Sequence, residues 1–150
     1  MTTEAALTVL GTHLAAAGTA LSRPITDVSR GLPYARGRQV RYYWDAETEP
    51  VRMGGQRTLT EEMVSHRINI AALWPVPDGS ETANTALDIE VVAFVDDVRG
   101  RILGDSTLGG NCTDLELDYA DADLVTIAGG LHLAVRWTLT MDYTAATIGP

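Results

Sequence analysis

The chain has 150 residues, of which 45% are hydrophobic, and its 20 acidic and 11 basic residues give a formal net charge of -9. A chain of this length fits one domain that buries roughly 68–70% of the surface of its unfolded form, and this apolar content excludes a disordered protein. The negative charge opposes neutralisation of phosphates, so it argues against tight binding of nucleic acid.

The first 60 residues predict one helix, two short strands and a loop. Residues 3–17 favour a helix because Leu7, Leu10 and Leu14 fall on one face, and Gly18 follows as a stop. A short strand at 25–29 and a strand at 38–44, rich in Val, Tyr and Trp, come next. Proline and glycine then predict an exposed loop at 45–58, and we expect residues 1–3 to be mobile.

The middle of the chain predicts a strand followed by a long helix. In the strand, at 62–74, Val64, His66, Ile68 and Ile70 share one face. The helix, at 80–103, begins at Ser80 as N-cap and ends before Gly104. Its apolar stripe consists of Leu87, Val91, Phe94, Val98 and Ile102.

After this helix the apolar pattern changes to period two. Leu115 and Leu117 alternate with acidic residues, and a short strand follows at 124–127. In a final strand at 131–141 the odd-numbered residues, including Leu131 and Trp137, form the face predicted to cover the core. The even-numbered residues from His132 to Asp142 are predicted to meet water or a partner. We expect residues 144–150 to be a mobile tail.

This order of elements predicts the fold class. Helix, strands, helix and strands in succession are typical of an α+β domain. We therefore expect a single domain over 1–150, with a mainly antiparallel or mixed β-sheet and two helices packed on one face.

The residue types that carry chemistry show no catalytic or metal-binding spacing. His13, His66 and His132 lie far from one another in sequence and from Cys112, the single cysteine, which we expect to be a small buried side chain. We therefore predict a protein that is not an enzyme, with no catalytic, cofactor-binding or metal residues. The alternative is a small enzyme with a site assembled from distant residues around His66 or His132, which would require a concave polar pocket.

Two groups of charged residues are candidate binding surfaces. The first group is a candidate inter-subunit or partner interface that consists of Arg36, Arg38, Arg41, Tyr43, Arg52 and Arg57. Arg and Tyr are enriched at protein interfaces, although a solvated strand edge is the simpler interpretation of this group. The second group is an acidic row of Asp114, Glu116 and Asp118, which is most simply a solvated surface and alternatively an interface or the lining of a channel.

Residues 62–143 resemble the tail terminator, or tail-completion, proteins of bacteriophages with long flexible tails. The similarity lies in the strand His66–Ile70, the Ala-rich helix 83–103, the Asp-Ser-Thr-Leu-Gly-Gly loop at 105–110 and the ending 131–140. Family members commonly carry Pro-Thr-Leu-Gly-Gly in this loop, where Ser106 here replaces the proline. The first 60 residues carry no part of the resemblance.

The resemblance implies a structural virion protein that forms a homo-oligomeric ring, expected to be a hexamer. Such a ring caps the tail tube, ends its polymerisation and joins the tail to the head-completion, or connector, protein. DNA would pass through the lumen without tight binding, and the acidic row would suit such a lumen. The expected location is the head-proximal end of the tail, with assembly in the host cytoplasm.

Alternative functions and locations follow from the same sequence. Another neck or tail subunit, such as a head-closure or tail tube protein, is the nearest alternative, and a monomeric adaptor is a third. No run of about 20 apolar residues is present to span a bilayer. Glu4 stands where a secretory signal would be basic, so we expect no signal peptide and no membrane partner.

Overall fold

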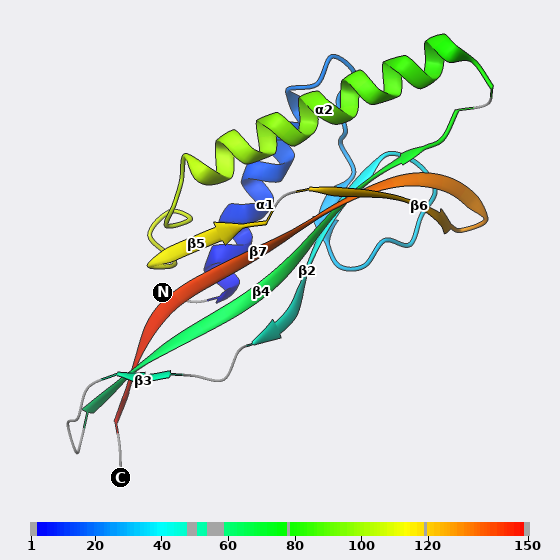
Figure 1. The fold of residues 1–150 in the computed structure, drawn as a ribbon. Helices are drawn as coiled ribbons and strands as arrows, with labels where there is room; N and C mark the ends of the chain where they lie inside the picture. Colours follow the sequence, from blue (N-terminus) through cyan, green and yellow to red (C-terminus); the bar gives the residue numbers. More distant parts are fainter. Residues whose placement is uncertain (1–2, 48–50, 54–58, 78, 119, 149–150) are drawn as a thin grey trace.

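The computed structural model describes residues 3–47, 51–53, 59–77, 79–118 and 120–148, with side chains described except at 51–53, 59–62 and 144–148. Within these residues the chain forms two helices and seven strands (Figure 1). In chain order they are α1 (Thr3–Thr19), β1 (Val28–Arg30), β2 (Gln39–Glu47), β3 (Val51–Met53), β4 (Leu59–Pro75), α2 (Glu81–Leu103), β5 (Asp114–Leu117), β6 (Asp121–Ile127) and β7 (Gly130–Ile148).

The strands form one mixed sheet in the order β1-β2-β4-β7-β5, in which only the β1–β2 pair is parallel. β3 pairs with β4. β5 and β6 both pair with the same edge of β7, β5 opposite residues 139–142 and β6 opposite residues 130–136. The predicted α+β class, with a mainly antiparallel or mixed sheet, is confirmed.

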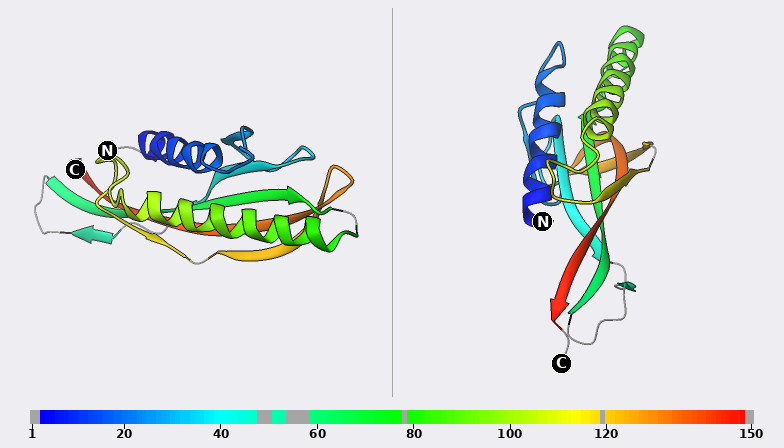
Figure 2. Two further views of the ribbon diagram at one scale, coloured as in Figure 1. Left: turned by 90° about the horizontal axis from the view of Figure 1, so that it is seen from above. Right: turned by 90° about the vertical axis from the view of Figure 1, so that its left-hand side faces the viewer.

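Both helices lie on one face of the sheet, as predicted (Figure 2). The stripe on α2 is buried at Val91, Phe94, Val98 and Ile102, and α1 contributes buried leucines to the same core. The Phe94 ring meets two tryptophan rings edge to face, at centroid distances of 5.6 Å and 6.1 Å. Neither helix, over the residues described, is long and apolar enough to cross a membrane.

Local sequence explains how the helices begin and how closely they pack. The Ser80 hydroxyl accepts a hydrogen bond from the Ala83 N–H at 3.3 Å, which confirms the predicted N-cap of α2. On α1, a Cβ at Gly11 would lie 2.3 Å from the Tyr42 hydroxyl. Glycine at this position therefore lets α1 approach β2 more closely than any other residue would.

A second, smaller apolar cluster lies on the opposite face of the sheet. Ala71, Leu73 and Ala134 are buried there, and the loop 31–38 covers this end of the face. His132 and Ala134 are therefore buried, which corrects the prediction that both would meet water or a partner. Leu131, predicted to cover the core, is 49% exposed because it lies beside the β6–β7 turn.

β4 and β7 extend beyond both helices as a projecting ribbon (Figures 1 and 2). Residues 59–64 of β4 pair with residues 143–148 of β7, and β3 adds a third strand beside β4. We call residues 51–53, 59–64 and 143–148 the arm. Three strands thus pair in this ribbon, whereas two strands alone are marginally stable in water.

The arm corrects two predictions about exposed segments. The loop expected at 45–58 holds the end of β2, to Glu47, and all of β3, while 48–50 and 54–58 lie outside the described residues. The tail expected to be mobile from 144 pairs with β4 as far as Ile148. Local sequence did not reveal these strands because their pairing partners are distant in the chain.

Candidate functional site

Hydrogen bonds to neighbouring residues hold the rings of His66 and His132. His66 Nδ1 accepts a hydrogen bond from Trp44 Nε1 at 2.8 Å, and its Nε2 lies 3.1 Å from the Tyr143 hydroxyl. His132 Nε2 accepts from the Gly37 N–H at 3.1 Å, so its Nδ1–H donates to the Gly130 carbonyl. Among the described residues, the Tyr143 hydroxyl is therefore the hydroxyl bonded to His66, whereas His132 bonds two backbone groups.

Cys112, the single cysteine, is a buried thiol close to several carboxylates. Burial, together with the carboxylates of Asp105, Asp114 and Asp142, raises the pKa of the Cys112 thiol to about 11. The thiol is therefore protonated at neutral pH, as expected of a buried apolar side chain. Over the described part of the chain, no three His, Cys, Asp or Glu side chains gather as metal ligands would.

Asp105 connects α1 to the loop that follows α2. Its carboxylate accepts a hydrogen bond from the Gly109 N–H at 3.0 Å and lies 2.8 Å from His13 Nε2. The Gly109 bond, followed by the bond with His13, lowers the pKa of Asp105 below its ordinary value of 3.8. The ionised form thus stabilises the folded state.

We expect Asp105→Ala to lower the free energy of unfolding by about 1 kcal/mol at neutral pH, because it removes this charge-assisted contact. A lowered folded-state pKa adds stability above the unfolded-state pKa, and that stability is lost as the pH falls through the folded-state pKa. Urea denaturation should therefore show the difference between wild type and variant shrinking below about pH 3.8. A difference that is constant with pH would contradict this.

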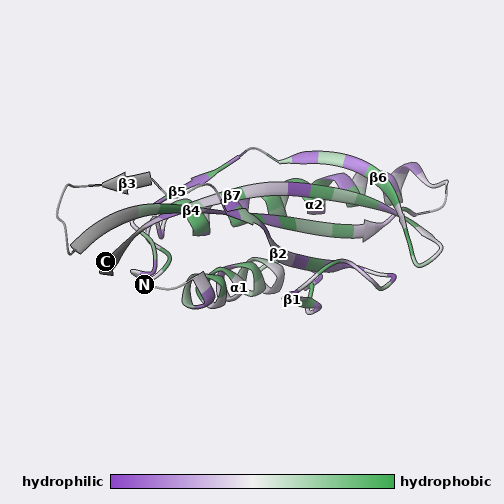
Figure 3. Cartoon of the chain, turned by 90° about the horizontal axis from the view of Figure 1, so that it is seen from below, coloured by the Kyte–Doolittle hydropathy of each residue, from purple (hydrophilic) through white to green (hydrophobic). Residues whose placement is uncertain are grey.

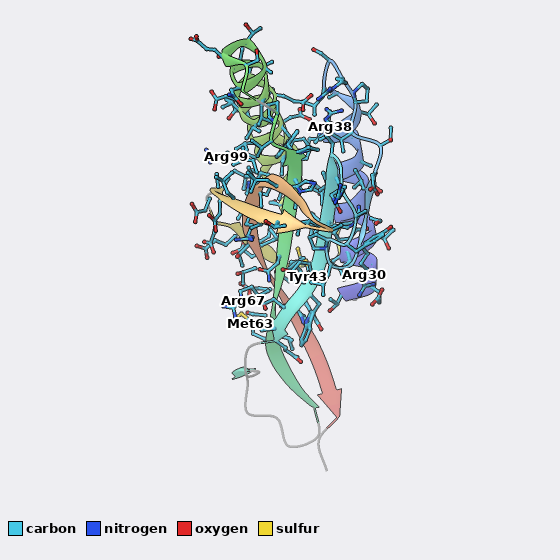
Figure 4. All side chains as sticks on the ribbon, turned by 90° about the vertical axis from the view of Figure 1, so that its right-hand side faces the viewer. Arg30, Arg38, Tyr43, Met63, Arg67 and Arg99 are labelled. Carbon is cyan, nitrogen blue, oxygen red and sulfur yellow. The ribbon has the colours of Figure 1, made fainter. Side chains whose placement is uncertain are left out.

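The structure does not bring the predicted arginine interface together as one surface. The Arg38 guanidinium, just before β2, forms an ion pair with Glu90 of α2 at 2.5 Å and donates to the Arg23 and Pro24 carbonyls in the segment after α1. Arg36 donates to the Ala128 carbonyl. Figure 4 shows Arg38 beside the helices and Tyr43 further along β2. Arg52 lies in β3 and Arg57 outside the described residues.

The prediction is wrong for Arg41. Its side chain is 0% exposed, because it is covered by an ion pair with Asp27 at 2.9 Å and by the Tyr34 ring at 5.1 Å. A residue without exposed surface does not contact a neighbouring subunit directly. The alternation of Arg and Tyr in this segment arises in part from packing within the chain.

The acidic row lies along the border of the sheet face opposite the helices. Asp114, Glu116 and Asp118 are all exposed, and the register places them on the same face as Thr138 and Thr140 of β7. Sequence reasoning missed two further members of this row, Asp121 and Asp123 of β6, which are exposed on the same face. Figure 3 shows hydrophilic residues alternating along β6. Asp121 and Asp123 are two residues apart, like the members of the predicted row, and this spacing was the signal.

A polar groove of about 530 Å³ crosses this same face. It brings the predicted residues Tyr43 and Asp118 together with Asn69, Asp121 and Arg136. A concave polar pocket, the feature required by the enzyme hypothesis, is therefore present. Among its described side chains, however, no hydrogen bond joins a nucleophile to a general base, and all three histidines lie outside its lining.

An apolar cleft of about 640 Å³ lies between the helices at the end of the sheet away from the arm. We call it the helix cleft. Its walls are the end of α1, the first half of α2 and the end of β4 with the segment after it. Its lining includes Ala17, Ala20, Leu21, Trp74, Pro75, Pro77, Ala83, Ala86, Leu87 and Ile89, with Arg23, Asp97 and the Arg38–Glu90 pair as charged members.

Comparison of the sequence with protein-family models and with curated proteins found no match.

Proposed function

We propose that this chain is a structural virion protein whose copies form a ring, expected to be a hexamer, at the end of a phage tail tube. The ring ends polymerisation of the tube and joins the tail to the head-completion protein, so its action is recognition without a chemical reaction. The resemblance of residues 62–143 to tail terminators supplies this specific assignment. DNA passes through the ring without tight binding, consistent with the net charge of -9.

The projecting arm is the structural observation that supports assembly most directly. The backbone of β4 and β7 extends as a paired ribbon beyond the helices, and a short ribbon of this kind is only marginally stable on its own in water. The engaged histidines and the protonated Cys112 thiol favour the same non-catalytic class.

Light scattering across concentration, with negative-stain imaging, tests this function. We expect a ring of about 97 kDa (6 × 16.1 kDa) with a central hole, formed by the chain alone or on purified tail tubes. In a reconstruction of the ring, Asp114, Glu116 and Asp118 should line the hole, and their placement on the outer rim would contradict the lumen assignment. A chain that stays monomeric both alone and with tail tubes would contradict the whole proposal.

The same imaging distinguishes the alternatives. A tail tube subunit would stack into long polymers, whereas a terminator stops at one ring, and a head-closure protein would bind the connector but not the tube. The polar groove is the one observation that favours a small enzyme. For an enzyme, Asp118→Asn or Arg136→Ala would abolish activity and leave the oligomeric state unchanged.

A further inference from the structure

The loop at 31–38 lies across one end of the sheet face opposite the helices (Figure 1). We call it the strap. Glycines lie at both of its ends, Gly31 with a φ of 122° and Gly37 with a φ of 112°, values that other residues rarely adopt. Its large apolar side chains do not anchor it, because Leu32 is 65% exposed and Tyr34 is 73% exposed. The strap is therefore held mainly by polar contacts.

Polar contacts join the strap to β2, to the β6–β7 turn and to β7. Gln39 of β2 donates a hydrogen bond to a carbonyl of the strap, and the Arg36 guanidinium donates to the Ala128 carbonyl in the turn. The Gly37 N–H donates to His132 Nε2 at 3.1 Å. Among these groups, the imidazole of His132 is the one that changes its charge between about pH 5 and 8.

The two hydrogen bonds of the His132 ring fix which nitrogen carries the proton. A backbone carbonyl only accepts, so Nδ1, which lies 2.8 Å from the Gly130 carbonyl oxygen, carries the hydrogen. A backbone N–H only donates, so Nε2, which faces the Gly37 N–H, has a free lone pair. The contact with the strap therefore requires the neutral ring, protonated on Nδ1.

A proton taken up from solvent would bond to this same lone pair on Nε2. The imidazolium ring then carries hydrogen on both nitrogens and no longer accepts from Gly37, so two donors face each other. We propose that the strap is a pH-sensitive latch, which is closed while His132 is neutral and opens when His132 is protonated. The latch is independent of the proposed virion function.

The surroundings of His132 give the imidazolium form no compensating partner. His132 is 1% exposed, and both of its ring nitrogens bond backbone groups rather than a carboxylate. Arg36, which has the same sign of charge, lies beside the ring, since a Cβ at Gly130 would be 3.3 Å from His132 Cε1 and 3.6 Å from Arg36 Cδ. A buried positive charge at this position is costly, which favours the open strap.

Other charged or titratable side chains on the elements around the ring are farther away or already paired. The part of β4 beside the ring, residues 71–75, carries none. On the remaining elements the described groups are Tyr34 of the strap, Arg38 of the strap paired with Glu90, Arg41 of β2 paired with Asp27, and Asp121, Asp123 and Arg136 of β6 and β7.

Opening of the strap uncovers the second apolar cluster of the sheet. Its buried members, Ala71, Leu73 and Ala134, are at most 6% exposed while the strap is closed. Neither helix lies on this face (Figure 2), so the strap is the cover that can move. The protonation state of one histidine thus controls whether this apolar surface meets solvent.

Hydrogen exchange of the Gly37 amide, measured by NMR and corrected for the intrinsic exchange rate at each pH, tests the latch. An imidazole in water takes up its proton at about pH 6.5, so one pH unit lower about ten charged rings are present for each neutral one. We expect the protection of the Gly37 amide to fall about tenfold between about pH 7.5 and pH 5.5, while the Phe94 amide in α2 stays protected. Equal protection of Gly37 at the two pH values, or no protection at either, would overturn the latch.

His132→Gln separates acceptance of the hydrogen bond from titration. The glutamine oxygen can accept from the Gly37 N–H and takes up no proton in this pH range, so the protection of Gly37 should become independent of pH. His66→Gln is the matched control, because His66 is also buried and accepts a hydrogen bond but pairs with Met141, far along β7 from His132. This control should lose protection of Gly37 as wild type does. A pH response that survives in His132→Gln would assign the opening to another group.

Nitrogen NMR of the imidazole rings gives a second measurement that needs no substitution. At neutral pH the proton of His132 should be on Nδ1, and Nε2 should gain a proton over the pH range in which the Gly37 amide loses protection. A proton on Nε2 at neutral pH, or protonation of the ring without loss of that protection, would contradict the latch. Far-UV circular dichroism should stay unchanged over this range, since a general loss of structure in mild acid would rule out a local opening.

Discussion

Trp137→Ala is expected to lower the free energy of unfolding by about 3–5 kcal/mol, the range for deleting a large buried aromatic side chain. Trp137 is 2% exposed, and its ring meets the Phe94 ring at a centroid distance of 6.1 Å. Phe94 in turn packs against Trp74, so the substitution removes the central contact between α2 and the sheet.

Chemical denaturation monitored by far-UV circular dichroism measures this effect, with Trp137→Phe as the matched control. The Trp137 indole N–H is buried and has no hydrogen-bond partner among the described residues. Phenylalanine keeps an aromatic ring against Phe94 and removes that unpaired donor, so it should cost clearly less than alanine. Equal losses for the two variants would show that the ring contact is not the source of the stability.

Asp27→Ala is expected to cost about 3 kcal/mol, the lower end of the range for removing one partner of a buried ion pair. The substitution leaves the Arg41 guanidinium buried at 0% exposure without a counter-charge. Two carbonyls and the Tyr34 ring remain beside it, but Arg41 Nε already has no hydrogen-bond partner within the described part of the chain. The expected loss is at the lower end of this range because the Asp27 side chain is 48% exposed. Water can therefore replace part of its interaction with the Arg41 guanidinium.

The two partners differ in burial, since Arg41 is buried and Asp27 is about half exposed, so removing one should cost more stability than removing the other. Arg41→Met removes the buried charge and leaves a half-exposed Asp27 that water solvates, so it should cost less than Asp27→Ala. The double variant Asp27→Ala with Arg41→Met should be more stable than Asp27→Ala alone. Thermal unfolding of the four proteins completes a double-mutant cycle, and equal costs for the two single variants would contradict the assigned burial of the charge.

Local periodicity was enough to predict the body of the fold. The leucines of α1, the apolar stripe of α2 with its Ser80 cap and the alternation in β4 and β7 each produced the predicted element on the predicted face. These signals are strong because each element buries one face in the same core, so the pattern repeats over several turns or several residue pairs.

The errors share one physical cause, which is contact between residues distant in sequence. The strand pairing of residues 144–148 depends on residues 59–63, and the burial of His132 depends on Gly37 and the loop around it. Arg41 was expected at an interface because nothing near it in sequence shows that Asp27 and Tyr34 enclose its guanidinium. The acidic row was found because alternation within one strand is a local signal, and its continuation onto β6 depends on both strands pairing with β7.

The alignment of β5 and β6 along one edge of β7 has a consequence for how copies avoid one another. Open strand edges are templates for unwanted sheet growth, and native proteins often protect them with charge. This edge carries Asp114, Glu116, Asp118, Asp121 and Asp123, all exposed. When two copies approach through these edges, carboxylates of like sign meet and repel. The charge along this border of the sheet therefore disfavours pairing of two copies edge to edge, which is the first step of fibrous aggregation.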